Sequence, residues 1–157
     1  MKMNSSAERA LSHLREQGLT LATAESCTGG LIGKLLTDVP GASQVYKGGV
    51  ISYTDWVKAN ILGVPEEMLE RFGAVSAPVA QAMAEGVRER LRADAAVSVT
   101  GLAGPGGDGY GNPVGTVFIG YRDEKNGVVR HYCFHGDREA VRQQTIEAAL
   151  QLVLENN

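Results

Sequence analysis

Thr23-Ala24-Glu25-Ser26-Cys27-Thr28-Gly29-Gly30 joins two stretches of different hydrophobic period. The run 19–23 before it is rich in strand formers, and the apolar residues after it recur at helical spacing (Leu31, Ile32, Leu35 and Leu36). Ser26 is therefore predicted to lie where a strand passes into a helix. Free backbone N–H groups and the positive helix end at such a junction can hold an anion. A hydroxyl, a thiol and two glycines fit a nucleophile beside an oxyanion site, and they equally fit a tight turn that needs small residues.

The pattern on either side of this junction predicts an α/β fold. Strands are expected at 19–24, 45–53, 95–100, 117–121 and 128–134, and helices precede, separate and follow them. Ser5, Asp55 and Asp137 are expected to cap helices, and Asn126-Gly127 predicts the tight turn of a hairpin. The order α-β-α-β-α-α-α-β-β-β-α predicts a single layered domain over residues 1–157. Its sheet is expected to be mixed and mostly parallel, flanked by helices, with a late β-hairpin.

Composition limits the classes of function. A chain of 157 residues with 43% hydrophobic residues is long and apolar enough for an ordinary globular core. The net charge of −3, without a cluster of Lys and Arg, argues against nucleic acid as a partner. No apolar run approaches the roughly 18 residues of a membrane span, and Met1–Arg9 lacks the apolar segment of a secretory signal. Two cysteines are too few for a disulfide framework, so we expect a cytoplasmic protein with reduced thiols.

Two glycine-rich stretches mark places where the backbone can approach a ligand. Gly48-Gly49 interrupts a strand that is expected to be mostly buried, and such a pair indicates a bulge or the close approach of a ligand or another backbone. Gly101–Gly115 holds seven glycines in fifteen residues, and its amides could wrap a phosphate. It matches neither a P-loop nor a dinucleotide-binding pattern, so a flexible surface loop fits its composition equally well.

Three strand ends are expected to meet at one edge of the sheet, where open α/β sheets place their sites. They carry Ser26, the segment Tyr53–Lys58 and the glycine-rich loop. With Asp55 as the cap, Lys58 falls in the first helical turn, where the helix dipole and burial both lower the pKa of a lysine. We hypothesise that Ser26 attacks, Lys58 takes its proton and Tyr53 bridges them. A surface lysine beside a core tyrosine is the alternative.

The remaining candidates surround the nucleophile. Thr28, Gly29 and Gly30 could supply N–H groups to an oxyanion. Cys27 is the rival nucleophile, because a thiolate is intrinsically stronger than an alcohol. However, no histidine lies in these motifs to activate it, so we favour Ser26 and expect Cys27 to pack as a small hydrophobe.

Two further pairs of side chains are candidate ligand sites, one for a phosphate and one for a metal ion. Arg138 and Arg142 share a face of the last helix, where Arg142 could clamp a phosphate through two parallel hydrogen bonds. A solvated helix face is the alternative. His131 and His135 could share one side of a strand, but no third ligand accompanies them, so we expect no metal site and no cofactor.

Taken together, the ordered motifs resemble the nicotinamide-nucleotide amidohydrolase family, which is the C-terminal domain of the competence-induced protein CinA and also occurs as a stand-alone enzyme. The resemblance covers roughly residues 8–154. The segments that carry it are Thr23–Gly30, Gly48–Tyr53, Lys58, Gly73–Ser76, Thr100–Pro105 and Pro113–Val117.

The resemblance implies deamidation of nicotinamide mononucleotide to nicotinate mononucleotide and ammonia, by a protein that assembles as a homo-oligomer. It implies Ser26 as nucleophile, with Lys58 and Tyr53 beside it. The implied substrate-binding residues are Thr28, Gly29, Gly30, Gly48, Gly49, Thr100, Gly101, Ala103, Gly104 and Arg142. Two other readings stay open: a non-catalytic nucleotide-binding or partner-binding paralogue, and an amidase that uses Cys27.

Overall fold

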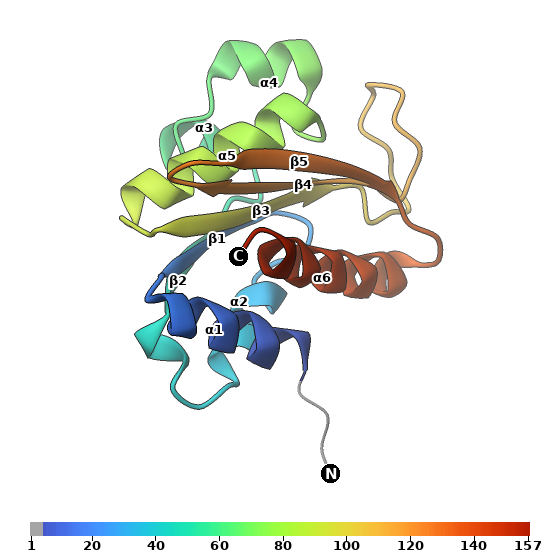
Figure 1. Ribbon diagram of the computed structural model, residues 1–157. Coiled ribbons are helices and arrows are strands. Elements are labelled where there is room, and N and C mark those ends of the chain that lie inside the picture. Colours follow the sequence, from blue (N-terminus) through green and yellow to red (C-terminus); the bar gives the residue numbers. More distant parts are fainter. Residues whose placement is uncertain (1–4) are drawn as a thin grey trace.

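The computed structural model describes residues 5–157, and its centre is a five-stranded sheet (Figure 1). The strands are β1 (Leu21–Glu25), β2 (Tyr46–Ile51), β3 (Ala95–Gly101), β4 (Thr116–Asp123) and β5 (Gly127–Cys133). They lie in the order β2-β1-β3-β4-β5, in which β2, β1 and β3 are parallel and β4 and β5 are added antiparallel. The expected mixed sheet with a late hairpin is confirmed. Two of its four strand pairings are parallel, because helical crossovers connect the strands only as far as β3.

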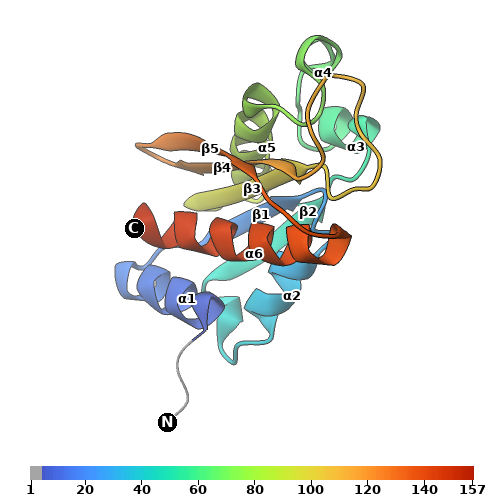
Figure 2. The ribbon, with the colours of Figure 1, turned by 90° about the vertical axis from the view of Figure 1, so that its right-hand side faces the viewer.

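Helices cover both faces of this sheet (Figures 1 and 2). One face carries α1 (Ser6–Gln17), α2 (Leu31–Thr37) and α6 (Arg138–Glu155), and the other carries α3 (Asp55–Asn60), α4 (Glu66–Phe72) and α5 (Ala77–Arg90). Successive residues of a central strand therefore enter different cores: Leu21 packs in the first and Ala22 in the second. None of the helices within residues 5–157 is long and apolar enough to cross a membrane. Residues 1–4 of the predicted domain lie outside the described residues.

Two predicted helix caps are confirmed. Ser5 caps α1, and its Oγ accepts a hydrogen bond from the N–H of Glu8 at 3.2 Å. Asp137 caps α6, and its carboxylate accepts from the N–H of Ala140 at 2.9 Å. Each cap satisfies one N–H group that the first helical turn leaves without a partner.

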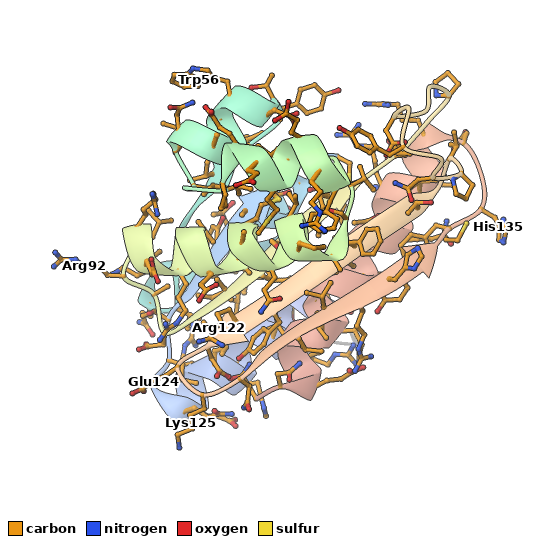
Figure 3. The ribbon with its side chains drawn as sticks, turned by 90° about the horizontal axis from the view of Figure 1, so that it is seen from above. Trp56, Arg92, Arg122, Glu124, Lys125 and His135 are labelled. Carbon is orange, nitrogen blue, oxygen red and sulfur yellow. The ribbon has the colours of Figure 1, made fainter. Side chains whose placement is uncertain are left out.

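The predicted cap of α3 is wrong by one residue. Thr54 has the extended backbone of a cap (φ −104°, ψ 161°), and its Oγ1 accepts from the N–H of Val57, so Asp55 is the first helical residue. Side chains two positions apart on a helix point about 200° apart. Lys58 accordingly turns inward and is buried, whereas Trp56 is 65% exposed and points away from the protein (Figure 3).

β2 is an edge strand, so the prediction that this segment is mostly buried is wrong. Its residues alternate between half-buried and exposed, because successive side chains of a strand point to opposite faces, and none is fully buried in this strand, which has β1 as its one neighbour. The pair of glycines nevertheless has a packing role: a Cβ on Gly49 would lie 2.2 Å from Thr23 Oγ1 and 2.7 Å from the Tyr46 hydroxyl. Those two hydroxyl groups are hydrogen-bonded to each other at 2.6 Å, and Gly49 leaves room for that bond.

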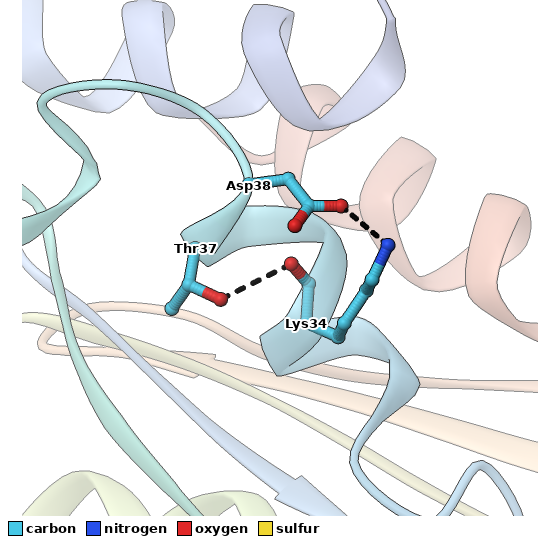
Figure 4. Close-up of polar contacts among 3 residues, drawn as sticks. All are labelled: Lys34, Thr37 and Asp38. Carbon is cyan, nitrogen blue, oxygen red and sulfur yellow. Dashed lines mark hydrogen bonds and ion pairs between the residues drawn. The ribbon is translucent and has the colours of Figure 1, made fainter.

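α2 is a short helix that begins directly after the turn at residues 26–30, and side chains near its carboxyl end form polar contacts there (Figure 4). Thr37 Oγ1 donates to the carbonyl oxygen of Lys34 at 3.1 Å, and Lys34 pairs with Asp38 at 2.7 Å. Both members of that ion pair are more than half exposed, so it contributes little to stability. A helix of seven residues needs stabilisation from its surroundings.

The topology creates a crevice at one edge of the sheet. β1 connects to β2 through α2 on one face, and β2 connects to β3 through α3, α4 and α5 on the opposite face. The two neighbours of β1 are thus reached from opposite sides, and ligands of open α/β sheets bind outside the carboxyl ends of strands at such a point. β5 ends at the same edge, because two antiparallel steps separate it from β3.

Changing Gly86 to Ala is expected to lower the free energy of unfolding by about 2–3 kcal/mol, because the added methyl group overpacks a tight contact. A Cβ at this position in α5 would lie 2.0 Å from the backbone oxygen of Leu62. Helix propensity alone would predict a gain of about 1 kcal/mol. Urea denaturation measures the difference. Gly106→Ala is the control, since nothing lies within 4 Å of its Cβ position, and equal stability of the two variants would contradict the prediction.

Candidate active site

A cavity of about 470 Å³ opens at this edge, which is within the size range of small-molecule sites. Three strand ends and the start of α6 form its wall, as expected for the strand ends. Its lining residues include Ser26 and Cys27 after β1, Tyr53, Asp55 and Lys58 after β2, Ala74 and Val75, Thr100–Asp108 after β3, and Arg138. The glycine-rich connection between β3 and β4 contacts α4, where the Tyr110 hydroxyl donates to the backbone oxygen of Glu70 at 2.9 Å.

Ser26 and Lys58, which are 32 positions apart in sequence, are in direct contact. Lys58 Nζ lies 3.0 Å from Ser26 Oγ and also donates to the backbone oxygen of Ser52 at 2.7 Å. The Lys58 side chain is 1% exposed and Ser26 is 7% exposed. An amine and an alcohol at this distance have the geometry of a base and the nucleophile that it activates.

Burial lowers the pKa of Lys58 from its ordinary value of 10.5, because the charged ammonium loses its water, and the negative charge of Asp55 opposes this shift. A neutral lysine carries two N–H groups and one lone pair. The backbone oxygen of Ser52 can only accept, so it holds one N–H. The lone pair can then face Ser26 and accept its hydroxyl proton.

Cys27 lines the same cavity but is a poor nucleophile. Burial raises the pKa of its thiol to about 11, against a smaller lowering by Lys58. At neutral pH the thiol therefore keeps its proton, and the thiolate is the reactive form. Cys27 is 6% exposed and belongs to the core that α1, α2 and α6 cover.

Tyr53 lies in the cavity wall, but its hydroxyl is not between the other two groups. It is 62% exposed, and it accepts a long hydrogen bond of 3.5 Å from Arg138. Within residues 5–157 it makes no hydrogen bond to Ser26 or Lys58. The segment after β2 is exposed at the sheet edge, so this ring reaches across the mouth of the cavity toward α6 rather than down to its floor.

The amino-terminal end of α2 is already occupied by a carboxylate from this chain. Glu25 accepts at Oε1 from Thr28 Oγ1 (2.6 Å) and from the N–H groups of Gly30 (3.2 Å) and Ile32 (3.0 Å), and at Oε2 from the N–H of Gly33 (3.0 Å). Its side chain is buried, with the residue 3% exposed. The positive end of the helix therefore stabilises Glu25 and is not open to an external anion.

This arrangement corrects the expected source of oxyanion donors. The N–H of Gly30 is used by Glu25, and the N–H of Gly29 donates to the backbone oxygen of Ser26 at 3.2 Å. Thr28, Gly29 and Gly30 do not line the cavity. The sequence indicated a helix end with free donors, but it could not indicate that the preceding glutamate turns back to fill it.

The other predicted binding residues fall into two groups. Thr100, Gly101, Ala103 and Gly104 line the cavity. Gly48, Gly49 and Arg142 do not line it. The glycines lie within edge strand β2, and Arg142 contacts the turn at residues 26–30, where it donates to the backbone oxygen of Thr28 at 3.2 Å. The Nε of Arg142 is buried and has no hydrogen-bond partner among residues 5–157.

Arg138 lines the cavity in the place expected for Arg142. It is the first residue of α6, and it donates to the backbone oxygen of Gly104 at 2.7 Å and to Tyr53. A signal for it was present in the sequence, because the hairpin returns the chain to the edge where β3 ends and Asp137 starts the helix there. Among residues 5–157 no group of three or more His, Cys, Asp or Glu side chains is placed to hold a metal ion.

Comparison with known proteins gives consistent matches. The family model of the CinA C-terminal domain matches residues 3–156. The chain is 46% identical over 139 residues to the nicotinamide-nucleotide amidohydrolase PncC of Escherichia coli strain K12. This match covers 88% of this chain and 84% of that protein. It is 50% identical over 136 residues to a CinA-like protein of Geotalea daltonii, covering 87% of this chain and 33% of the relative. The chain thus spans about a third of the length of such CinA-like relatives.

Solved structures show the same fold. A competence-damaged protein (CinA) superfamily protein from Escherichia coli superposes with a TM-score of 0.93 at 32% identity, covering 100% of this chain and 95% of that one. The competence/damage inducible protein CihA from Agrobacterium tumefaciens superposes with a TM-score of 0.89 at 39% identity, covering both chains fully. With a family model matched over nearly its whole length, this chain belongs to the CinA C-terminal domain family.

Proposed function

We propose that this protein hydrolyses the carboxamide of nicotinamide mononucleotide to nicotinate mononucleotide and ammonia, with Ser26 as nucleophile and Lys58 as base. The observation that carries the proposal is the 3.0 Å contact between Lys58 Nζ and Ser26 Oγ at the floor of a cavity. The similarity to a relative named nicotinamide-nucleotide amidohydrolase supports the choice of substrate.

The reaction follows from this pair in two stages. Ser26 Oγ attacks the carboxamide carbon while neutral Lys58 takes the hydroxyl proton. Lys58 then gives that proton to the departing nitrogen, so ammonia leaves and an ester forms on Ser26. In the second stage Lys58 takes a proton from water, the hydroxide attacks the ester carbon, and the proton returns to Ser26 Oγ as the acid is released.

The negative oxygen of each tetrahedral intermediate needs hydrogen-bond donors. The backbone N–H of Cys27, which lines the cavity, directly follows the nucleophile and donates to no backbone or side-chain acceptor outside its own residue among residues 5–157. We assign this group to the oxyanion, in place of those of Thr28, Gly29 and Gly30. It needs no reorganisation, because the turn that carries it is held by Glu25 and Arg142.

The phosphate is expected to lie near Arg138. Arg138 is the one arginine in the cavity lining, and the other basic side chain there, Lys58, is neutral in this mechanism and in contact with Ser26. The adjacent segment Gly104–Gly107 also lines the cavity, and the backbone oxygen of Gly104 is in contact with Arg138. Guanidinium groups bind phosphate through paired hydrogen bonds, so Arg138 has the chemistry that the nucleotide requires.

Ammonia release tests this proposal directly. The purified wild-type protein is incubated with nicotinamide mononucleotide, and ammonia and nicotinate mononucleotide are measured together. Equal amounts of the two products are expected. A protein that binds the nucleotide, detected by calorimetry, but releases no ammonia would favour a non-catalytic nucleotide-binding paralogue. The homo-oligomer and the cytoplasmic location that were expected from the sequence stay predictions.

A further inference from the structure

We propose that Glu25 and Ser52 are positioning residues, which together set the distance between Ser26 Oγ and Lys58 Nζ. The inference rests on the proposed function of that serine and lysine. Neither residue lines the cavity, and neither takes part in a chemical step. Both are almost completely buried, at 3% and 0% exposure.

The side chain of Glu25 holds the nucleophile. Glu25 is the last residue of β1, so its backbone is fixed by the sheet, and Ser26 is covalently attached to it. Its carboxylate accepts four hydrogen bonds from the turn and from the first turn of α2. Ser26 therefore lies between a residue anchored in the sheet and a turn that is bound back onto that same residue.

The backbone of Glu25 holds the base through Ser52. The backbone oxygen of Glu25 accepts from the N–H of Ser52 at 2.7 Å and from its Oγ at 3.1 Å. The backbone oxygen of Ser52 in turn accepts from Lys58 Nζ at 2.7 Å, and Lys58 contacts Ser26. These contacts close a ring through four residues: Glu25, Ser52, Lys58 and Ser26. A shift of Glu25 or Ser52, the outer pair, therefore displaces Ser26 or Lys58, the inner pair.

A role in positioning has a particular kinetic signature. A misplacement of about 1 Å can lower a rate about 10²-fold when reacting groups must be aligned. Since Glu25 and Ser52 do not line the cavity, their loss removes no contact with substrate. We therefore expect kcat to fall while KM stays unchanged. Glu25 fills the amino-terminal end of α2, so this helix end does not hold the phosphate of the substrate. The decrease in kcat is therefore expected to be equal for nicotinamide mononucleotide and for the nucleoside that lacks the phosphate.

Two variants test the ring at its two outer members. Glu25→Gln keeps the size of the side chain but places an NH₂ group against the N–H of Gly33. Ser52→Ala removes only the hydroxyl that donates to Glu25. We expect kcat to fall by about 10–100-fold in each, with KM unchanged. Ser52→Ala decides the matter where Glu25→Gln does not fold.

The control is Ser5→Ala, which removes the cap of α1 and destabilises the fold without touching the site. Its kcat per folded molecule, measured well below its melting temperature, is expected to equal that of the wild type. A rise of KM in Glu25→Gln would overturn the proposal, because it would indicate that Glu25 contacts the pyridine group of the substrate. An unchanged kcat in both ring variants would overturn it in favour of a purely structural role.

A readout that does not use the nucleotide separates this inference from the proposed function. A fluorophosphonate reacts with an activated serine by forming an O–P bond and expelling fluoride, and mass spectrometry locates the adduct. We expect labelling of Ser26 in the wild type and a rate about 10–100-fold lower in the two ring variants. Failure of the wild type to release ammonia would defeat the proposed function alone. Equal labelling rates in the wild type and both variants would defeat the positioning role.

Discussion

Replacing Ser26 by Ala is expected to lower the rate of ammonia release from nicotinamide mononucleotide by about 10⁶-fold, which is the order of loss found when the nucleophile of a serine protease is removed. The physical reason is that no other group can take its place. The Cys27 thiol is adjacent, but burial raises its pKa to about 11, so it stays protonated at neutral pH. The quantity to measure is kcat, with nucleotide binding followed separately by calorimetry, because the variant is expected to retain binding.

Cys27→Ala is the matched control for this experiment. It removes the neighbouring side chain from the same turn and leaves the hydroxyl of Ser26 in contact with Lys58. We expect it to keep most of the wild-type rate. The opposite result, in which Ser26→Ala is active and Cys27→Ala is not, would identify a cysteine amidase and reject the serine mechanism.

Replacing Lys58 by Arg is expected to lower kcat by about 10²–10⁴-fold, which is the usual contribution of a general base. Arginine keeps its proton at all accessible pH values, so it cannot accept one from Ser26. Its guanidinium keeps N–H groups of the kind that donate to Ser26 Oγ and to the backbone oxygen of Ser52. The comparison therefore isolates the ability to lose a proton from the ability to form a hydrogen bond.

The pH dependence provides a second measurement of the same role. Lys58 acts only when neutral, so the kcat/KM of the wild type is expected to rise with pH and to level off above the pKa of Lys58. Burial holds that pKa below 10.5, so the inflection lies below the ordinary lysine range. The residual activity of Lys58→Arg is expected to lack this inflection.

The control for Lys58 is Lys34→Met, at a lysine on the surface of α2 whose side chain is 65% exposed. It removes a positive charge of the same kind without touching the cavity. Its kcat and pH profile are expected to match those of the wild type. A Lys58→Arg variant with full activity would show that the base is another group.

Much of the fold could be predicted from hydrophobic period and helix caps. The order of helices and strands, the late hairpin and the meeting of three strand ends at one edge all follow from local pattern together with the rules for parallel connections. The placement of strand 45–53 in the interior failed, because burial of a strand depends on its position in the sheet order. That order results from which helices cross which face, and β2 lies at the edge.

The candidate site divides in the same way. Ser26 and Lys58 were predicted as partners from the junctions that carry them, and the structure brings them into contact. Glu25 was missed as the group that fills the end of α2, and Arg138 was missed as the cation of the cavity. In both places the residue type was visible, but the direction of a long side chain depends on neighbours that are distant in sequence.

Local chemistry along the chain was therefore enough to predict Ser26 and Lys58 as partners and the edge of the sheet where they meet. It could not tell which N–H groups of the turn at residues 26–30 stay free, nor which of two arginines on one helix face reaches the cavity. Those outcomes depend on packing among β1, α2 and α6. The last of these is far from the other two in sequence, and the three come together only when the helices pack on the sheet and form its two hydrophobic cores. Burial then lowers the pKa of Lys58 and raises that of Cys27, because the loss of water around these side chains is a property of the folded protein.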